Sequence, residues 1–123
     1  PRWAFIQRNR SADARAEIAQ ITLPLLALWG ADDLNVDAQT DAAIYRETMQ
    51  APHPATQIDI LSNATHGLLR SGPYNWQLVA QWPWHARLRF LAAGRYAYAP
   101  GALDQIIAWI NGRATQATPA SRG

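Results

Sequence analysis

Cysteine and lysine are both absent from this chain of 123 residues. Without cysteine the sequence cannot form a disulfide scaffold, a thiolate nucleophile, a cysteine-ligated zinc site or an iron–sulfur cluster. The formal net charge of +2 comes from eleven arginines set against nine acidic residues. Because the arginines are scattered from Arg2 to Arg122 without a dense run, the sequence does not indicate a nucleic-acid partner.

Long apolar runs are missing as well. The longest covers residues 23–29, far short of the ~20 residues that a transmembrane helix needs. Residues 1–20 hold no continuous apolar stretch, so no signal peptide is visible. A content of 49% hydrophobic and 16% charged residues is typical of a globular chain. We therefore expect a soluble, cytoplasmic protein with no membrane partner.

The middle of the chain has the pattern of a βαβ unit. Residues 21–30 form an apolar run ended by Gly30, which predicts a strand buried on both faces, with Pro24 among its first residues. Residues 37–49 predict a helix capped by Asp37, and residues 57–62 predict a second strand. Strand, helix and strand within about 40 residues predict two parallel strands joined by a right-handed crossover.

The flanking segments are mainly helical in character. Residues 11–19 predict a short helix capped by Ser11, and residues 74–91 predict an aromatic-rich helical stretch divided by Pro83. A loop follows at residues 96–101. A last helix is expected over residues 103–111, ended by Gly112 and followed by a frayed tail. The fold class is therefore α/β, a βαβ unit with parallel strands plus C-terminal helices.

Two parallel strands are too few for a stable sheet when both have the composition of buried strands. Such a sheet would leave unpaired edges and uncovered apolar surface. We infer that further strands lie outside this chain, or that something binds to it.

Functional groups in an open parallel sheet gather at the carboxyl ends of the strands. Asp32 and Asp33 follow the first strand, and His66 follows the second. The crossover brings both loops to one edge, where a carboxylate on one imidazole nitrogen fixes the tautomer and leaves the other nitrogen as a general base.

These residues stand in a pattern that resembles the C-terminal part of the α/β-hydrolase family. The pattern consists of Ile21, Pro24, Leu26, Leu28, Trp29, Gly30, Asp33 and Val36, followed by His66-Gly67 after the next strand. A weaker resemblance, to the last loop and helix of bacterial members, covers residues 98–112. The resemblance implies that Asp33 is the triad acid and His66 the base. It also implies that residues 1–20 are a helical lead-in, the end of a cap or connector. Residues 21–112 would then be the C-terminal hydrolase portion and residues 113–123 a flexible tail.

The nucleophile half of the family pattern is absent. None of the four serines, Ser11, Ser62, Ser71 and Ser121, stands in a Gly-x-Ser-x-Gly-like turn. The family's proline shortly after the acid is also replaced, here by Asp37. The substrate-binding residues stay unknown.

Simpler structural roles remain open for each of these residues. Asp33 could merely cap the following helix, and Asp32 is the less favoured acid. His66 could be a hydrogen-bonded structural histidine, His53 is expected in a loop, and His85 is expected to pack. Three histidines without ligand spacing do not indicate a metal site, and no cofactor is implied.

The tryptophans Trp76, Trp82 and Trp84 allow three interpretations. They could form core, a partner surface or a substrate pocket, and we favour the core.

Two functions of different classes follow, and a third is least favoured. In the first, the chain is the acid–base portion of a serine-type hydrolase that acts on an ester, amide or similar acyl bond once a nucleophile-bearing segment completes it. In the second, it is a non-catalytic remnant that forms a homodimeric binding or assembly module. In the third, Asp32 or Asp33 is itself the nucleophile, although the family's aspartate nucleophiles lie on an earlier strand.

Overall fold

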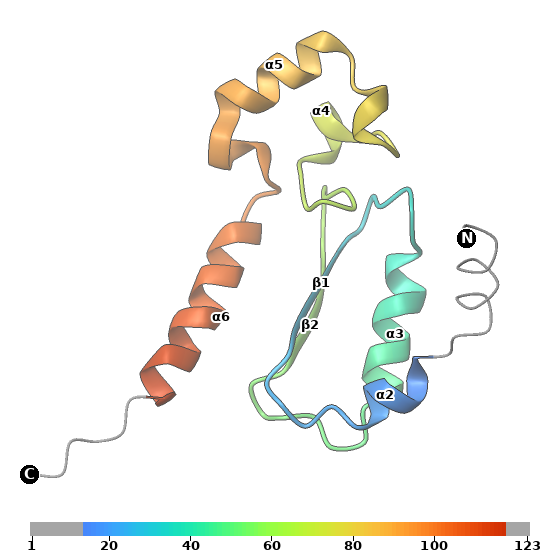
Figure 1. The fold of residues 1–123 in the computed structure, drawn as a ribbon, viewed down its shortest axis with the longest axis vertical. Helices are drawn as coiled ribbons and strands as arrows, with labels where there is room; N and C mark the ends of the chain where they lie inside the picture. The colour runs from blue at the N-terminus through green and yellow to red at the C-terminus, as the bar shows by residue number, and fades with distance from the viewer. Residues whose placement is uncertain (1–13, 118–123) are drawn as a thin grey trace, which may run out of the picture.

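The computed structural model describes residues 14–117 of the chain, and Figure 1 shows their arrangement. Two parallel strands lie between α3 on one side and α6 on the other, and α4 and α5 lie beyond one end of the strands. In chain order the elements are α2 (Arg15–Ala19), β1 (Leu26–Gly30), α3 (Ala38–Thr48), β2 (Gln57–Leu61), α4 (Ser71–Tyr74), the 3₁₀ turn η1 (Val79–Gln81), α5 (Trp84–Ala93), the 3₁₀ turn η2 (Gly94–Ala97) and α6 (Ala102–Ala117). The predicted α/β class with a strand–helix–strand unit is confirmed.

The sheet pairs β1 with β2 in a register that runs from Leu26↔Gln57 to Gly30↔Leu61. β1 is shorter than the predicted strand because the Leu25 N–H donates to the Thr56 hydroxyl at 3.4 Å instead of to a backbone carbonyl of the neighbouring strand. Regular pairing starts only where the Gln57 N–H donates to the Leu25 carbonyl at 2.8 Å. The predicted burial on both faces is wrong for this part of the chain, since most strand residues are only half-buried. In the described residues, β1 pairs with β2 alone, and the outer edge of each strand has no strand beside it.

Helix α3 covers one face of the sheet. Its predicted cap is confirmed, because Asp37 Oδ1 accepts the N–H groups of Gln39 at 3.0 Å and Thr40 at 3.1 Å. The ring of Tyr45 then meets Trp29 of β1 edge-on, with centroids 5.3 Å apart. Since side chains alternate along a strand, Trp29 and its neighbours in register face α3, and the intervening residues face α6.

Helix α6 lies over the opposite face and is anchored through polar groups. Gln105 Nε2 donates to Asp59 Oδ2 at 2.5 Å, and Trp109 Nε1 donates to the Ala55 carbonyl at 2.9 Å. The prediction that this helix ends at Gly112 is wrong, because α6 continues to Ala117. Gly112 lacks the positive φ that a glycine helix end requires, so it is accommodated as an interior helix residue. Ser11 and residues 118–123 lie outside the described residues.

The segment that follows the sheet forms a small aromatic cluster of its own. Tyr74 stacks on Trp82 with centroids 5.4 Å apart, and Phe90 meets both rings edge-on. Pro83 separates η1 from α5, as predicted. The core interpretation holds for Trp82, which is buried, and Trp76 packs beside it.

Two predictions fail in this segment. Trp84 is 73% exposed, and His85 is exposed where packing was predicted. The buried face of α5 is formed instead by Ala86, Phe90 and Ala93.

Candidate active site

The loops that follow β1 and β2 are joined directly through their backbones. Ala31 N–H donates to the Leu61 carbonyl at 2.8 Å, and Asp32 N–H donates to the Ala64 carbonyl at 2.9 Å. A Cβ placed on Gly30 would lie 2.2 Å from the carbonyl oxygen of Thr65, so only glycine fits at the end of β1. This close approach places the residue after Thr65 beside the residues that follow Gly30.

His66 occupies the second position of a tight turn. The turn is closed by Leu68 N–H, which donates to the Thr65 carbonyl at 2.9 Å, and Leu68 has a left-handed φ of 57°. A bulky residue adopts that conformation only when its surroundings hold it there. Here the Leu68 carbonyl accepts the Ala99 N–H at 2.8 Å, which ties the turn to the segment just before α6.

Asp33 and His66 form a hydrogen-bonded pair at this edge of the sheet. His66 Nδ1 lies 2.8 Å from Asp33 Oδ2, and the two side chains are 60% and 2% exposed respectively. An ionised carboxylate has no proton to donate, so Nδ1 must carry the proton in this pair. In the neutral ring, Nε2 then has a free lone pair on an exposed imidazole.

The carboxylate of Asp33 is held ionised by its surroundings. Burial by itself would raise its pKa, but three hydrogen bonds act the other way. Asn35 N–H and Val36 N–H donate to Oδ1 at 2.7 and 3.2 Å, and His66 binds Oδ2. Together with the charge of His66, they hold the pKa of Asp33 below its ordinary value of 3.8.

The structure thus brings together the two residues that sequence analysis singled out. Asp33 does not cap α3, because Asp37 has that position, and Asp32 is exposed and contributes its backbone N–H to the loop contact. His53 lies apart from the pair in the loop before β2, where its Nδ1 accepts the Ala55 N–H at 3.1 Å.

The groups that support this pair were not predicted from the sequence. The amides of Asn35 and Val36 lie two and three residues after the aspartate, the usual spacing of a local side-chain turn, so a sequence signal existed. Thr65 is buried, and its Oγ1 accepts the Leu69 N–H at 3.2 Å, which stiffens the turn. No sequence pattern predicts that contact.

The pair can act as a general base with its orienting acid. In residues 14–117 no group of three or more His, Asp or Glu side chains is placed to bind a metal ion. None of the helices described is both long and apolar enough to cross a bilayer. Comparisons with family models, with curated proteins and with solved structures each return no match to this chain.

Proposed function

We propose that this chain is the acid–base portion of a serine-type α/β-hydrolase, with the nucleophilic serine on a segment outside it. The observation that carries the proposal is the 2.8 Å contact between His66 Nδ1 and the buried carboxylate of Asp33. A buried acid behind an exposed imidazole is the arrangement that activates a hydroxyl presented from another segment.

The steps assigned to the pair are proton transfers. His66 Nε2 takes the proton of the serine hydroxyl as its oxygen attacks the acyl carbon. Asp33 stabilises the resulting imidazolium through Nδ1–H, and the imidazolium then gives its proton to the departing alcohol or amine. A water molecule then attacks the acyl-serine while His66 Nε2 takes its proton. That proton returns to the serine oxygen, and the carboxylic acid product is released. The reaction requires no metal or cofactor.

The unpaired edge of β1 supports the proposal that residues outside this chain complete the site. Gln57 N–H binds the Leu25 carbonyl and Ala31 N–H binds the Leu61 carbonyl. By alternation, Leu26, Leu28 and Gly30 direct their backbone groups to the other edge of β1. The Gly30 carbonyl accepts the Asp33 N–H at 3.2 Å, but no strand pairs with this edge in residues 14–117, so it offers a place for a further strand.

The test compares the chain alone with the chain expressed in frame with the sequence encoded upstream of Pro1. Hydrolysis of an unactivated alkyl ester and labelling by a fluorophosphonate are measured for both. The longer protein is expected to be labelled on a serine. Asp33→Asn is expected to lower its kcat roughly 10⁴-fold, and His66→Ala roughly 10⁶-fold. The chain alone is expected to match its own His66→Ala variant.

Two results would contradict the proposal. Ester hydrolysis by the chain alone above the His66→Ala control would show that no external nucleophile is needed. A longer protein without a labelled serine would remove the hydrolase assignment.

The open edge of β1 also favours a second candidate, a non-catalytic homodimer in which two copies of β1 pair. Light scattering distinguishes this candidate, because it requires a dimer at micromolar concentration. Leu28→Pro removes an edge-facing N–H together with a half-buried side chain that faces α6, and Leu28→Ala controls for the side chain. Only the proline variant is expected to turn the dimer into a folded monomer. A wild-type monomer would exclude the homodimer.

A further inference from the structure

A pocket of about 350 Å³ lies where α4, α5 and η2 meet. Two of its lining side chains are arginines, Arg70 from the segment before α4 and Arg89 from α5, and none is acidic. The rest of the lining is aromatic or apolar and consists of Pro73, Tyr74, Ala93 and Tyr96. The pocket therefore offers two positive groups beside an apolar wall, which is the pattern of a site for a small organic anion.

Arg70 is held in position by its backbone and by its side chain. Its backbone N–H donates to the Ala97 carbonyl at 2.9 Å, and its Nε donates to the Tyr98 carbonyl at 3.3 Å. Nη1 and Nη2 have no hydrogen-bond partner within residues 14–117, so they are available to a ligand. Because the guanidinium is already positioned, less conformational entropy is lost when it binds an anion.

The positive charge at this pocket is not neutralised within residues 14–117. Neither Arg70 nor Arg89 forms an ion pair there, whereas Arg95, which shares a second hollow with Arg70, is paired with Asp104 at 3.1 Å. No acidic residue occurs between Asp59 and Asp104 in the sequence. Two like charges beside one pocket repel each other, so an anion bound between them removes that repulsion.

The charge and the size of the pocket favour an organic phosphate monoester. A monoester carries close to two negative charges above about pH 6, which match two arginines, whereas a carboxylate carries one. The fork of a guanidinium also fits phosphate oxygens in a bidentate geometry. The pocket is larger than a phosphate group alone, so it has room for an organic group. Tyr96, which is 72% exposed, offers that group a ring face.

We propose that this pocket binds a small organic phosphate monoester. The phosphate lies between the guanidinium groups of Arg70 and Arg89, and the organic group lies against the ring of Tyr96. This binding site shares no residue with the Asp33–His66 pair, and its occupancy does not depend on the proposed hydrolase role.

The test is isothermal titration calorimetry of the purified full chain with phenyl phosphate, and with benzoate and inorganic phosphate for comparison. Phenyl phosphate is expected to bind saturably at about pH 8, about tenfold or more tighter than benzoate. Inorganic phosphate, which has no ring to place against Tyr96, is expected to bind more weakly as well. Binding of phenyl phosphate should weaken as salt is raised, and also at about pH 5, where the monoester loses its second charge.

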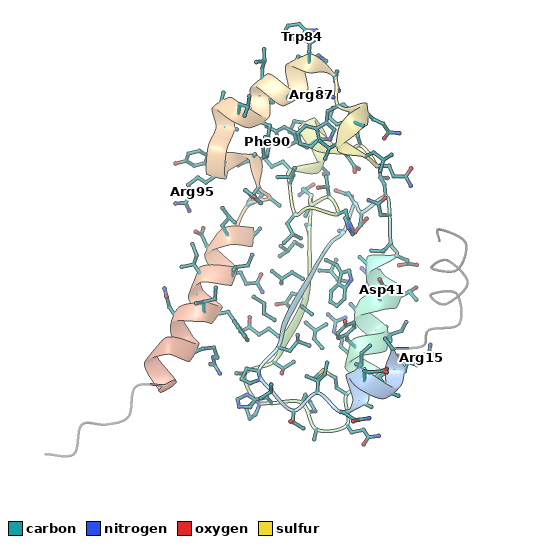
Figure 2. The ribbon with its side chains drawn as sticks, in the orientation of Figure 1. Arg15, Asp41, Trp84, Arg87, Phe90 and Arg95 are labelled. Carbon is teal, nitrogen blue, oxygen red and sulfur yellow. The ribbon has the colours of Figure 1, made fainter. Side chains whose placement is uncertain are left out.

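Arg89→Gln is the central variant, and Arg87→Gln is its matched control. Both remove one positive charge from an exposed position of α5. Arg87 does not line the pocket, and its Nη2 donates to the Ala80 carbonyl at 3.4 Å. Figure 2 shows Arg87 on the side of α5 toward η1, away from Arg95 and η2. Arg89→Gln is therefore expected to weaken binding of phenyl phosphate about tenfold or more, while Arg87→Gln stays within about twofold of wild type.

Tyr96→Ala is a second variant that tests the other half of the pocket. It should weaken binding of phenyl phosphate but leave that of inorganic phosphate within about twofold, because only the organic group contacts the ring. Circular dichroism checks that every variant is folded.

Three results would overturn the proposal. The first is no saturable binding of phenyl phosphate, and the second is an equal loss for Arg89→Gln and Arg87→Gln, which would indicate attraction by net charge alone. The third is binding by this chain but not by the longer protein that includes the sequence encoded upstream of Pro1. An acidic side chain of the added segment would then be the occupant of the pocket.

Discussion

Gly30→Ala is the substitution for which the structure makes the sharpest prediction. The added Cβ would lie 2.2 Å from the Thr65 carbonyl oxygen, 2.3 Å from the Ala64 carbonyl oxygen and 2.6 Å from the Ala64 carbonyl carbon. All three atoms are backbone, so no side-chain rotation relieves the clash. The two loops would have to separate by about 1 Å or more to restore ordinary van der Waals contact.

The cost follows from what that separation disrupts. Overpacking alone costs about 1–3 kcal/mol. The contact also carries the bonds from Ala31 N–H to Leu61 and from Asp32 N–H to Ala64, each worth about 1 kcal/mol. Together they amount to about 3–5 kcal/mol, a large part of the stability of a domain of this size.

Urea denaturation followed by circular dichroism measures the effect. Gly67→Ala is the local control, since the nearest atom to its added Cβ is Leu69 Cγ at 3.9 Å. Gly112→Ala is the helical control: its Cβ would meet open space within α6, so it should raise the stability by about 0.5–1 kcal/mol. If Gly30→Ala unfolds at the wild-type midpoint, then Gly30 does not approach the Ala64–Thr65 backbone as closely as described, and this contact does not position His66.

Three further substitutions test other parts of the structure. Asp33→Asn should abolish a stability increment that wild type holds above about pH 3.8 and loses as the pH falls through the lowered pKa of Asp33. The urea midpoints of wild type and Asp33→Asn are measured against pH, and they should therefore converge in acid. Exposed Asp32→Asn is the control. Trp82→Ala should destabilise the chain by about 3–5 kcal/mol in thermal melts, because it empties the centre of the aromatic cluster, while exposed Trp84→Ala should change stability by less than about 0.5 kcal/mol. Trp109→Phe should cost about 1 kcal/mol in the same assay, since it removes the indole donor to the Ala55 carbonyl; a change near zero would mean that this bond does not hold α6 on the sheet.

The parts of the fold that local chemistry determines could be predicted from the sequence. The cap at Asp37, the break at Pro83 and the strand–helix–strand order each depend on residues close together in the chain. The meeting of Asp33 and His66 could be predicted as well, because it follows from topology: two parallel strands end at the same edge.

The failures concern long-range packing. Whether Trp84 is buried depends on the phase of α5 against Trp82, which no local pattern defines. The turn at His66 is fixed by Ala99, which lies more than thirty residues away in the chain. The extension of α6 past Gly112 reflects the absence of any competing left-handed turn there.

The Asp33–His66 pair is organised entirely by contacts within this chain. The amides of Asn35 and Val36 fix one oxygen of Asp33, and the backbone approach at Gly30 brings the turn of His66 to the other oxygen. None of these contacts involves a group outside residues 14–117, so the pair is already formed within the chain. In the proposed hydrolase, an acid and base oriented in advance would need only a hydroxyl within reach of Nε2, so the rate would depend on how the proposed serine-bearing segment presents that group rather than on rearrangement of the pair.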